Sequence, residues 1–333
     1  MKETTVDDLS KLPPGSSVET TFLVQSKERR TTNVGKPYLD LTLQDSTGQV
    51  RAKIWDLDRV RLDFEEDDIV RVNAVVEEYQ GARQLKVKSV SRAGESLPLR
   101  DYVPHSAEDP AVLLAAVVER ARRVSSCPLR QLLLAVLEDP VIAEKYQQAP
   151  AATSLHHAYL GGLVEHVRSL LFLGDRVSDH YPALDRDLVI AGLILHDVGK
   201  IEELTFERGL RYTTRGKLLG HITLGLALVR DKATQIQGFP PELWDRLEHI
   251  ILSHHGKLEF GSPKEPAFPE ALVVHYLDDM DSKVASMTAQ YAAESTQEGD
   301  WTSRNRALGR ELLKPSAQVK NDSNAAPNSP DAP

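Results

Sequence analysis

Cysteine is almost absent from the sequence, with Cys127 alone among 333 residues. A single thiol excludes a disulfide framework and a zinc site built from four thiolates, and we expect a reducing, cytoplasmic location. Long apolar runs are missing too. The stretch at residues 188–195 is far shorter than the roughly 20 residues that span a bilayer, and residues 1–17 lack the apolar centre of a secretory signal. We therefore expect no membrane partner.

Positive charge is scarce relative to negative charge. The chain has 40 lysines and arginines against 49 aspartates and glutamates, which gives a formal net charge of −9. This balance argues against wholesale, non-specific binding of nucleic acid, but it leaves room for a local basic groove. The hydrophobic share of 41% and the charged share of 27% are those of an ordinary globular protein. At this length, about two domains are expected.

Residues 18–92 have the pattern of β-strands. Runs that are rich in β-branched residues or alternate in polarity are separated by turn signals such as DSTGQ and YQGAR. This part has 13 basic and 13 acidic residues, so it is neutral although the whole chain is acidic. Five short strands punctuated in this way predict a small closed sheet, an OB-type β-barrel over residues 15–92, with an SH3-like barrel as the alternative.

The pattern changes after the barrel. Residues 93–110 contain three prolines and small polar residues, which is typical of a linker. Over residues 111–313, apolar positions recur at spacings of three and four, which predicts an all-α helical bundle. Residues 314–333 have one valine and no larger apolar side chain, so we expect a disordered tail. The predicted fold class is multi-domain α+β, with a five-stranded barrel followed by a helical bundle.

Histidine and aspartate recur through the helical half at intervals of 24 to 33 residues. Facing helices of a bundle can aim such side chains at one internal metal site. Imidazole together with carboxylate suits manganese, iron, zinc or nickel better than magnesium, which prefers oxygen ligands alone. The positions are His166, the pair His196–Asp197, His221, the pair His254–His255, and the acidic residues Asp278, Asp279 and Asp281.

Three of these positions also have a purely structural interpretation. His166 and His221 lie in apolar helical stretches, where a histidine can be a satisfied core residue. His196 can cap a helix, with the following aspartate beginning a turn. The recurrence of ligand-type residues in several segments favours the metal site over these separate explanations.

The paired and clustered positions differ in geometry. Consecutive helical residues lie about 100° apart, so we expect His254 as a ligand and leave His255 for the substrate or for a supporting role. Asp278 and Asp281 share a helix face, whereas Asp279 is turned away. Asp281 can also belong to a solvated acidic face.

At these residues the chain resembles the HD-domain phosphohydrolase superfamily, in the longer H…HD…H…H…D form of its two-metal members. The order of barrel and helical domain is similar, more closely, to the YhaM family of bacterial 3′–5′ exoribonucleases, over about residues 15–310. One departure is LDDMDSK at 277–283, where the family pattern has Ala-Asp-x-Leu-Asp-Ala-Lys. The motifs that carry the resemblance are SLHHAYLGGLVEHV (154–167), LILHDVGK (193–200), GKLLGHITLG (216–225), ILSHHG (251–256) and VHYLDDMDSK (274–283).

The resemblance implies a metal-dependent 3′–5′ exoribonuclease that hydrolyses the phosphodiester bonds of single-stranded RNA, with single-stranded DNA as an alternative substrate. It implies two divalent cations, Mn²⁺ first, with Fe²⁺, Co²⁺, Ni²⁺ and Mg²⁺ as alternatives. Such enzymes often form homo-oligomers, but the sequence reveals no interface. The implied metal ligands are His166, His196, Asp197, His221, His254 and Asp278.

Two residues have implied catalytic roles. Asp197 would be shared by both cations, because a carboxylate can bridge two ions. Lys200 would add positive charge at the scissile phosphate, or it would be a lysine at a helix carboxyl end that interacts with the helix dipole. His157, Lys217 and His255 are substrate-contact candidates, with a solvent-facing or structural role as the alternative for His157 and Lys217.

The barrel is expected to hold the nucleic acid. Single strands are bound by aromatic stacking together with a basic track along the backbone. Tyr38, Lys36 and Lys53 are the residues that we assign to this surface, whereas we expect Phe22 and Trp55 in the barrel core.

Two other functions remain open at this stage. One is a phosphohydrolase or phosphodiesterase that acts on small nucleotides, although a mononucleotide needs no stacking groove. The other is a non-catalytic nucleic-acid-binding protein with a vestigial HD domain, although all six ligand positions hold ligand-type side chains.

Overall fold

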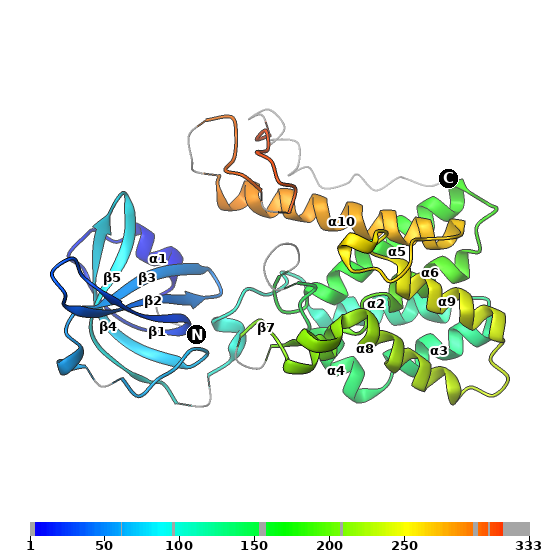
Figure 1. Ribbon diagram of the computed structural model, residues 1–333, viewed down its shortest axis with the longest axis horizontal. Coiled ribbons are helices and arrows are strands. Elements are labelled where there is room, and N and C mark those ends of the chain that lie inside the picture. Colours follow the sequence, from blue (N-terminus) through cyan, green and yellow to red (C-terminus); the bar gives the residue numbers. More distant parts are fainter. Residues whose placement is uncertain are drawn as a thin grey trace, which may run out of the picture.

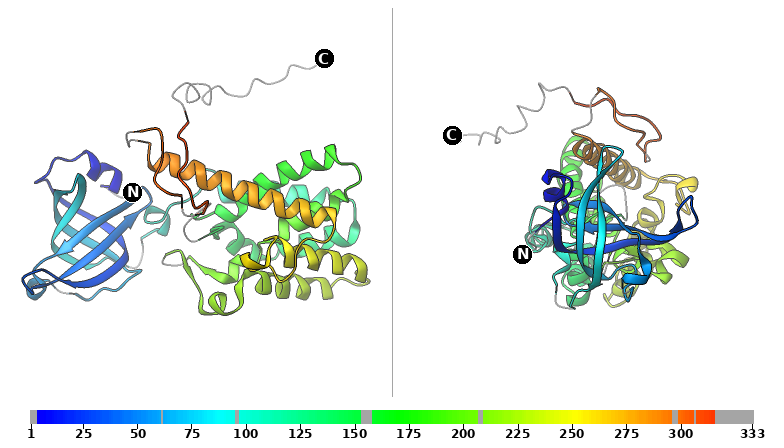
Figure 2. Two further views of the ribbon diagram at one scale, coloured as in Figure 1. Left: turned by 45° about the horizontal axis from the view of Figure 1, so that its top comes forward. Right: turned by 90° about the vertical axis from the view of Figure 1, so that its left-hand side faces the viewer.

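The computed structural model describes residues 4–60, 62–94, 97–152, 158–206, 209–295, 299–305 and 307–315. Two units follow one another along the chain, a β-barrel and a helical bundle, and the barrel lies at one end of the bundle (Figures 1 and 2). The multi-domain α+β fold expected from the sequence is thereby confirmed. Within the described part of the chain, no helix has the length and apolar character needed to cross a membrane.

The barrel has the expected five strands and is closed, in the order β1-β2-β3-β5-β4. Neighbouring strands are antiparallel except β3 and β5, whose parallel pairing closes the sheet together with the β1–β4 pair. Inward-facing side chains such as Phe22, Leu41, Ile54 and Val72 are buried and form its core. The strands are β1 (Ser17–Thr31), β2 (Pro37–Asp45), β3 (Gly48–Ile54), β4 (Ile69–Tyr79) and β5 (Ala82–Arg92).

A short helix, α1 (Val6–Lys11), adds to the barrel before the boundary expected at residue 15. Thr5 and Asp8 form a capping box at its start, and Leu9 packs into the barrel core. The backbone N–H of Val6 donates to Asp45 at the end of β2 (2.8 Å). The helix therefore covers one end of the barrel. A 3-10 helix, η1 (Leu57–Arg59), follows β3.

The segment expected to be a linker is packed against both units where it is described. After the 3-10 helix η2 (Leu99–Asp101), Tyr102 is buried, and its hydroxyl lies 2.7 Å from the Thr21 hydroxyl of β1. Gln44 of β2 donates to the Tyr102 carbonyl (3.2 Å). On the bundle side, the Leu160 N–H donates to the Pro104 carbonyl (2.9 Å). Residues 97–106 therefore form a fixed connection.

The bundle is built around α6, in which every residue from Leu188 to Leu195 is buried. Helices α3, α5, α9 and α10 pack against it, which explains the continuous apolar run in the sequence. The helices are α2 (Pro110–Arg122), α3 (Cys127–Leu137), α4 (Pro140–Gln148), α5 (Gly162–His180), α6 (Arg186–Leu195), α7 (Lys200–Glu203), α8 (Thr214–Thr234), α9 (Pro241–Ser253) and α10 (Pro269–Ala293), with the 3-10 helix η3 (Leu258–Phe260) between the last two.

A two-stranded hairpin, β6 (Leu204–Thr205) and β7 (Arg211–Tyr212), follows α7 and reaches the barrel. Arg211 donates to Asp67 Oδ1 (2.9 Å) in the loop before β4 and lies 3.4 Å from Glu66. Gly209 abuts the same loop, since a Cβ there would lie 2.9 Å from Asp67 Oδ1. This contact joins the barrel to the element that immediately follows α7.

Candidate metal centre and nucleic-acid surface

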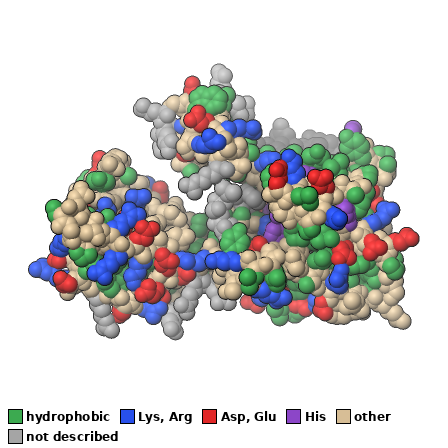
Figure 3. Space-filling view, viewed as in Figure 1, with side chains coloured by type: hydrophobic (Ala, Val, Ile, Leu, Met, Phe, Trp, Pro, Cys, Tyr) green, Lys and Arg blue, Asp and Glu red, His purple; other side chains and the backbone are tan. Residues whose placement is uncertain are grey.

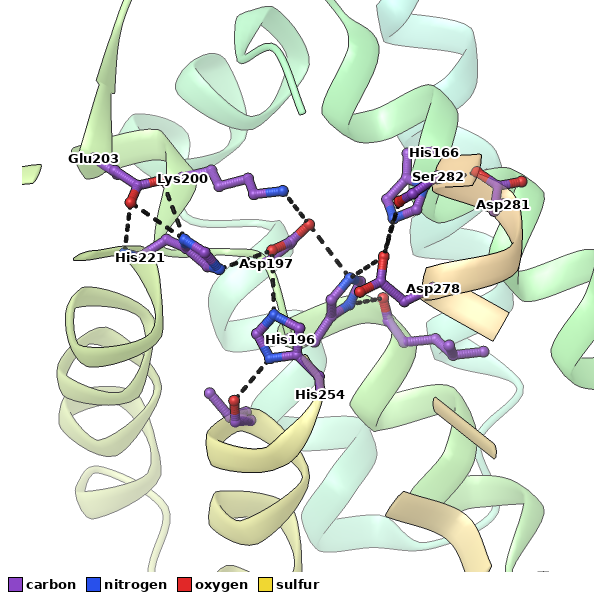
Figure 4. A network of polar contacts seen from close by, with 12 residues as sticks. His166, His196, Asp197, Lys200, Glu203, His221, His254, Asp278, Asp281 and Ser282 are labelled. Carbon is purple, nitrogen blue, oxygen red and sulfur yellow. Dashed lines mark hydrogen bonds and ion pairs between the residues drawn. The ribbon is translucent and has the colours of Figure 1, made fainter. Parts of the chain in front are cut away.

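The six residues expected as metal ligands converge inside the bundle from separate elements (Figure 4). Three of them lie within helices, His166 in α5, His221 in α8 and Asp278 in α10. The others lie where helices end, since His196 is the C-cap residue of α6 and His254 that of α9, and Asp197 follows His196 in the turn. From these helix ends, both imidazoles reach the centre (Figure 4).

The first cluster consists of His166, His196, Asp197 and Asp278, whose ligand atoms all lie within 4.8 Å of one another. Asp278 Oδ1 lies 3.2 Å from His166 Nε2 and 3.8 Å from His196 Nε2. Asp197 Oδ2 lies 3.3 Å from the same His196 atom. Two imidazoles and two carboxylates thus surround one buried point.

The second cluster consists of His221, His254 and His255, whose ligand atoms are also within 4.8 Å of one another. The other oxygen of Asp197, Oδ1, faces it, 3.4 Å from His221 Nε2 and 3.6 Å from His254 Nε2. Asp197 therefore lies between the clusters with one oxygen toward each. This is the arrangement expected of a bridging carboxylate.

In each of these histidines, Nδ1 is held by a hydrogen bond on the outer side. The Nδ1–H groups of His196 and His254 donate to the carbonyls of Leu193 (3.0 Å) and Ile251 (2.8 Å) within their own helices. A carbonyl only accepts, so these rings carry their proton on Nδ1 and present the Nε2 lone pair inward. Such outer partners fix the tautomer and orientation of metal-binding imidazoles.

Carboxylates hold the rings of His166 and His221, a role that the sequence does not predict for them. Asp281 accepts from His166 Nδ1 (2.7 Å) and from the Ser169 hydroxyl (2.6 Å). Glu203 accepts from His221 Nδ1 (3.1 and 3.2 Å to its two oxygens) and from the His221 backbone N–H (3.0 Å). The solvated-face interpretation of Asp281 is therefore wrong, since its carboxylate is 12% exposed and faces His166.

Several inward atoms have no hydrogen-bond partner among the described residues. They are Nε2 of His196, His221 and His254, and Oδ1 of Asp197, all of which are buried. Leaving a buried acceptor unsatisfied costs about 1–3 kcal/mol, and here the lone pairs point at one another. A divalent cation at each cluster would satisfy them, so the donor set and its burial fit a metal centre.

The two central carboxylates are ionised. Burial would raise the pKa of Asp197, but Lys200 and His196 hold that pKa well below its usual range. The pKa of Asp278 is also lowered, because its contact with His166 and the nearby His196 outweigh the effect of burial. Anionic ligands are thus available across the neutral pH range.

The histidines differ in how readily they accept a proton. Burial and the neighbouring His196 and His255 hold the pKa of His254 well below its usual range. Burial, together with His221, lowers the pKa of His255 as well. Both rings are therefore neutral at pH 7, which is the form that binds a metal.

Lys200 lies at the first residue of α7 and donates to Asp197 Oδ2 (2.6 Å). It follows the turn after α6, and its ammonium is bonded to the Asp197 carboxylate. Burial would lower the pKa of Lys200, but Asp197 and Asp278 raise it, so the ammonium is charged. A fixed cation thus lies beside the shared carboxylate.

Two glycines bring α7 and α8 together around His221. A Cβ on Gly199 would lie only 2.0 Å from the His221 carbonyl oxygen. Gly220 interrupts α8 with φ +71°, a left-handed conformation that favours glycine. The interruption releases the His221 backbone N–H from helical bonding, and Glu203 accepts it. Backbone geometry thus sets the position of this ligand.

On the barrel, Tyr38, Lys53, Trp55 and Tyr79 form a surface group that we call the barrel patch. Tyr38 of β2 stacks on Trp55 with ring centroids 4.7 Å apart. The Lys53 ammonium lies 5.1–5.8 Å from the centroids of all three aromatic rings. The expectation of Trp55 in the core is wrong, because residues 53 and 55 alternate with the buried Ala52 and Ile54 and so face outward. Phe22 is buried, as expected.

The remaining predicted contacts are less organised. Lys36 pairs with Asp56 (3.3 Å), near the barrel patch in sequence, and is exposed. Lys217 is exposed in the first turns of α8, and His157 lies outside the described residues. Over the face in Figure 3, basic side chains of the barrel are interspersed with acidic ones, in line with the neutral composition of residues 18–92.

Two family models match the chain. Residues 23–92 match an OB-fold nucleic acid binding domain, and residues 163–283 match an HD domain. The first match covers the closed barrel, and the second contains all six expected ligands. Each match therefore falls on the unit to which the sequence assigned it.

Curated relatives match along nearly the whole chain. The chain is 35% identical over 305 residues to the 3′-5′ exoribonuclease YhaM of Bacillus subtilis strain 168, covering 90% of this chain and 96% of the relative. It is 36% identical over 308 residues to the protein of the same name from Geobacillus sp. strain WCH70, covering 90% of this chain and 93% of the relative.

Solved structures match over little more than a quarter of the chain. A replication protein A heterotrimer bound to single-stranded DNA matches at 16% identity with a TM-score of 0.24, covering 28% of this chain and 80% of that chain. A domain of replication protein A from Methanococcus maripaludis matches at 23% identity with a TM-score of 0.23, covering 27% of this chain and 96% of that chain.

Proposed function

This chain belongs to the YhaM family of 3′–5′ exoribonucleases, and from that premise we propose that the histidine–aspartate centre is where it hydrolyses RNA from the 3′ end. It is a metal-dependent hydrolase that acts on nucleic acid. The observation that carries the assignment of the site is the convergence of inward-facing Nε2 atoms on both sides of Asp197. These residues include no serine, threonine or cysteine, and their imidazole and carboxylate groups are placed to bind metal, so a hydrolytic water is the expected nucleophile.

The two clusters would hold one divalent cation each. His166, His196 and Asp278 would bind the first, His221 and His254 the second, and Asp197 would bridge them. The mixed imidazole and carboxylate set favours Mn²⁺, with Fe²⁺, Co²⁺, Ni²⁺ and Mg²⁺ as alternatives. When bound, such a pair lowers the pKa of water and offsets charge on the phosphoryl oxygens.

The protein's own groups prepare the site for an anionic substrate. Lys200 keeps a positive charge beside Asp197, where the two side chains are 12% and 2% exposed. There it can approach a phosphate oxygen while it holds Asp197 Oδ2 in place. Asp281 and Glu203 keep His166 and His221 in the tautomer that faces inward. The site is therefore preorganised, which reduces the rearrangement needed during reaction.

We propose that the barrel patch grips the single strand upstream of its 3′ end. Tyr38 and Trp55 offer aromatic faces on which bases can stack, and Lys53, with Lys36 nearby, offers charge for the phosphates. Strands β2 and β3 and the β4–β5 loop are the surfaces that OB-folds use for oligonucleotides. The substrate that we propose is single-stranded RNA, with single-stranded DNA as the alternative.

Further substrate contacts and the setting of the enzyme are also proposals. Lys217 and His157 are candidates for the strand near the metal centre. A single cysteine suits action in a reducing cytoplasm. We also propose a homo-oligomer, which light scattering can test.

The experiment uses a 5′-labelled RNA with a single-stranded 3′ end, with and without Mn²⁺. The wild-type protein should shorten it stepwise from the 3′ end, and Asp197→Ala should abolish the metal-dependent shortening. Asp279→Ala is the matched control, because Asp279 lies on the same helix as Asp278 but pairs with Lys283 outside the centre. Cleavage of mononucleotides alone, or binding without cleavage, would contradict the proposal.

A further inference from the structure

We propose that His255 is a third imidazole ligand of the second cation, together with His221 and His254. The inference rests on the two-metal centre of the proposed function and changes its composition. The second position would then have three imidazole nitrogens and one oxygen of Asp197, whereas the first has two imidazoles and two carboxylates. His255 would be a metal ligand rather than the substrate contact that the sequence suggested.

The end of α9 explains how consecutive histidines can face the same point. The separation of about 100° applies to neighbours within a helix. Helix α9 ends at Ser253, and His254 is its C-cap residue, so His255 lies beyond the helix. Gly256 then takes φ +78°, which reverses the chain. The rings of His254 and His255 lie 4.4 Å apart between centroids, at an angle of 71°. One ring nitrogen of His254 and one of His255 can therefore approach the second cluster from different directions.

The hydrogen bond of His255 fixes which nitrogen is available. Its Nδ1 lies 2.8 Å from the carbonyl oxygen of Phe260 in η3. Since a carbonyl only accepts, Nδ1 carries the proton and Nε2 of the neutral ring has a lone pair. The ring then cannot donate from Nε2 to a phosphate oxygen, but it can bind a cation. This tautomer distinguishes a metal ligand from a substrate contact.

The distances support one shared ion. The ligand atoms of the three histidines all lie within 4.8 Å of one another, and the His221 and His255 ring centroids are 5.1 Å apart. His254 is fully buried, and its Nε2 has no hydrogen-bond partner among the described residues. Lone pairs of neutral imidazoles that lie this close together repel one another unless a cation lies between them.

The composition predicts the kind of cation. Imidazole nitrogen suits Zn²⁺, Cu²⁺, Fe²⁺ and Ni²⁺, while carboxylate oxygen suits Mn²⁺ and Mg²⁺. Co²⁺ lies between Fe²⁺ and Ni²⁺ in the affinity series, above Mn²⁺. The second position should therefore hold Co²⁺ more tightly, relative to Mn²⁺, than the first does. The two clusters would therefore prefer different cations, although Asp197 is common to both.

The experiment counts bound Co²⁺. The full-length protein is stripped with EDTA and titrated with Co²⁺ by calorimetry, and retained cobalt is measured by mass spectrometry after gel filtration. The key variant is His255→Asn, because an asparagine amide can still donate to the Phe260 carbonyl while the Nε2 ligand is lost. His180→Ala, at the exposed end of α5, is the control. His255→Ala is a second variant, and circular dichroism verifies folding.

We expect two cobalt ions in the wild type and in His180→Ala. In both His255 variants, one ion should bind as before and the affinity for the other should fall by at least tenfold. Two ions bound with unchanged affinity in a folded His255→Asn protein, with a raised KM for RNA, would overturn the inference and restore the substrate role. Absence of bound metal in the wild type would instead overturn the proposed two-metal centre itself.

Discussion

The Lys200 ammonium donates to Oδ2 of Asp197 over 2.6 Å, while Oδ1 of the same carboxylate faces His221 and His254. One oxygen is thereby paired with a fixed cation, and the other lacks a hydrogen-bond partner among the described residues. Burying an ionised carboxylate without a charged partner would cost folding free energy. Lys200 therefore stabilises the centre before any metal arrives.

Replacing Lys200 tests this relationship. In Lys200→Met the buried Asp197 loses its partner, and breaking a buried pair in this way costs about 3–5 kcal/mol. We expect the free energy of unfolding of the metal-free protein to fall by about that amount, and added Mn²⁺ to restore most of it. Urea unfolding with and without Mn²⁺ measures both. An unchanged stability of the metal-free variant would show that Asp197 does not depend on Lys200.

The two carboxylates that hold the imidazoles should act on different cations. Asp281→Asn removes the charged acceptor for His166, and Glu203→Gln removes that for His221. Loss of such a partner typically weakens metal affinity about 10–100-fold. Calorimetric titration should show weaker binding of the cation at the first cluster in Asp281→Asn, and of the cation at the second cluster in Glu203→Gln. Asp279→Asn is the control, and equal loss of both steps in both variants would contradict independent clusters.

The barrel patch should determine the affinity for long substrates. Stacking of a base on an aromatic side chain contributes about 1–3 kcal/mol to the binding free energy. Trp55→Ala and Tyr38→Ala should therefore each reduce the free energy of binding a single-stranded RNA by about 1–3 kcal/mol. Cleavage of a dinucleotide, too short to reach the barrel, should be unchanged. Fluorescence anisotropy measures the first and product chromatography the second. Tyr181→Ala, an exposed aromatic of the bundle, is the control. Equal loss on both substrates would indicate damage to the metal centre instead.

The barrel and the six histidine and aspartate positions that meet in the centre could be predicted because their signals are local. Alternation and turn residues define short strands, and the ligands are rare residue types in motifs at regular intervals. The inward orientation of His196 and His254 follows from their places at helix ends. These features need no knowledge of which helices pack together.

The supporting residues could not be found in the same way. Glu203 approaches His221 only because Gly220 interrupts α8 and Gly199 lets α7 pack directly on it. Arg211 contacts Asp67 across 144 positions of sequence, and no pattern in either segment pairs them. Trp55 was within reach, because its alternation with Ile54 already places it on the outer face. The approach of His255 to His221 could not be predicted, because the sequence does not show where α9 ends.

The close approach at Gly199 predicts a steric effect on the centre. A Cβ there would lie 2.0 Å from the His221 carbonyl oxygen and 2.4 Å from the Gly225 nitrogen, so Gly199→Ala must push α7 and α8 apart. Overpacking of this kind lowers the free energy of unfolding by about 1–3 kcal/mol. The displacement of His221 should also weaken binding of the cation at the second cluster. Thermal unfolding and calorimetry measure these effects. Gly94→Ala, which meets nothing within 4 Å, should change neither.

The loop that follows the second cluster should loosen in mild acid. The backbone N–H of Ala267 donates to Nε2 of His249 (3.0 Å), which requires a ring unprotonated at that nitrogen. Burial, with Lys264 nearby, lowers the pKa of His249. The unfolded chain therefore takes up this proton more readily, so the contribution to stability is complete above the unfolded pKa of about 6.5 and is lost as pH falls below it. His249→Gln can keep the acceptor without titrating. Urea unfolding from pH 8 to pH 5 should show the wild type losing more stability than this variant, and parallel curves would contradict the role of His249.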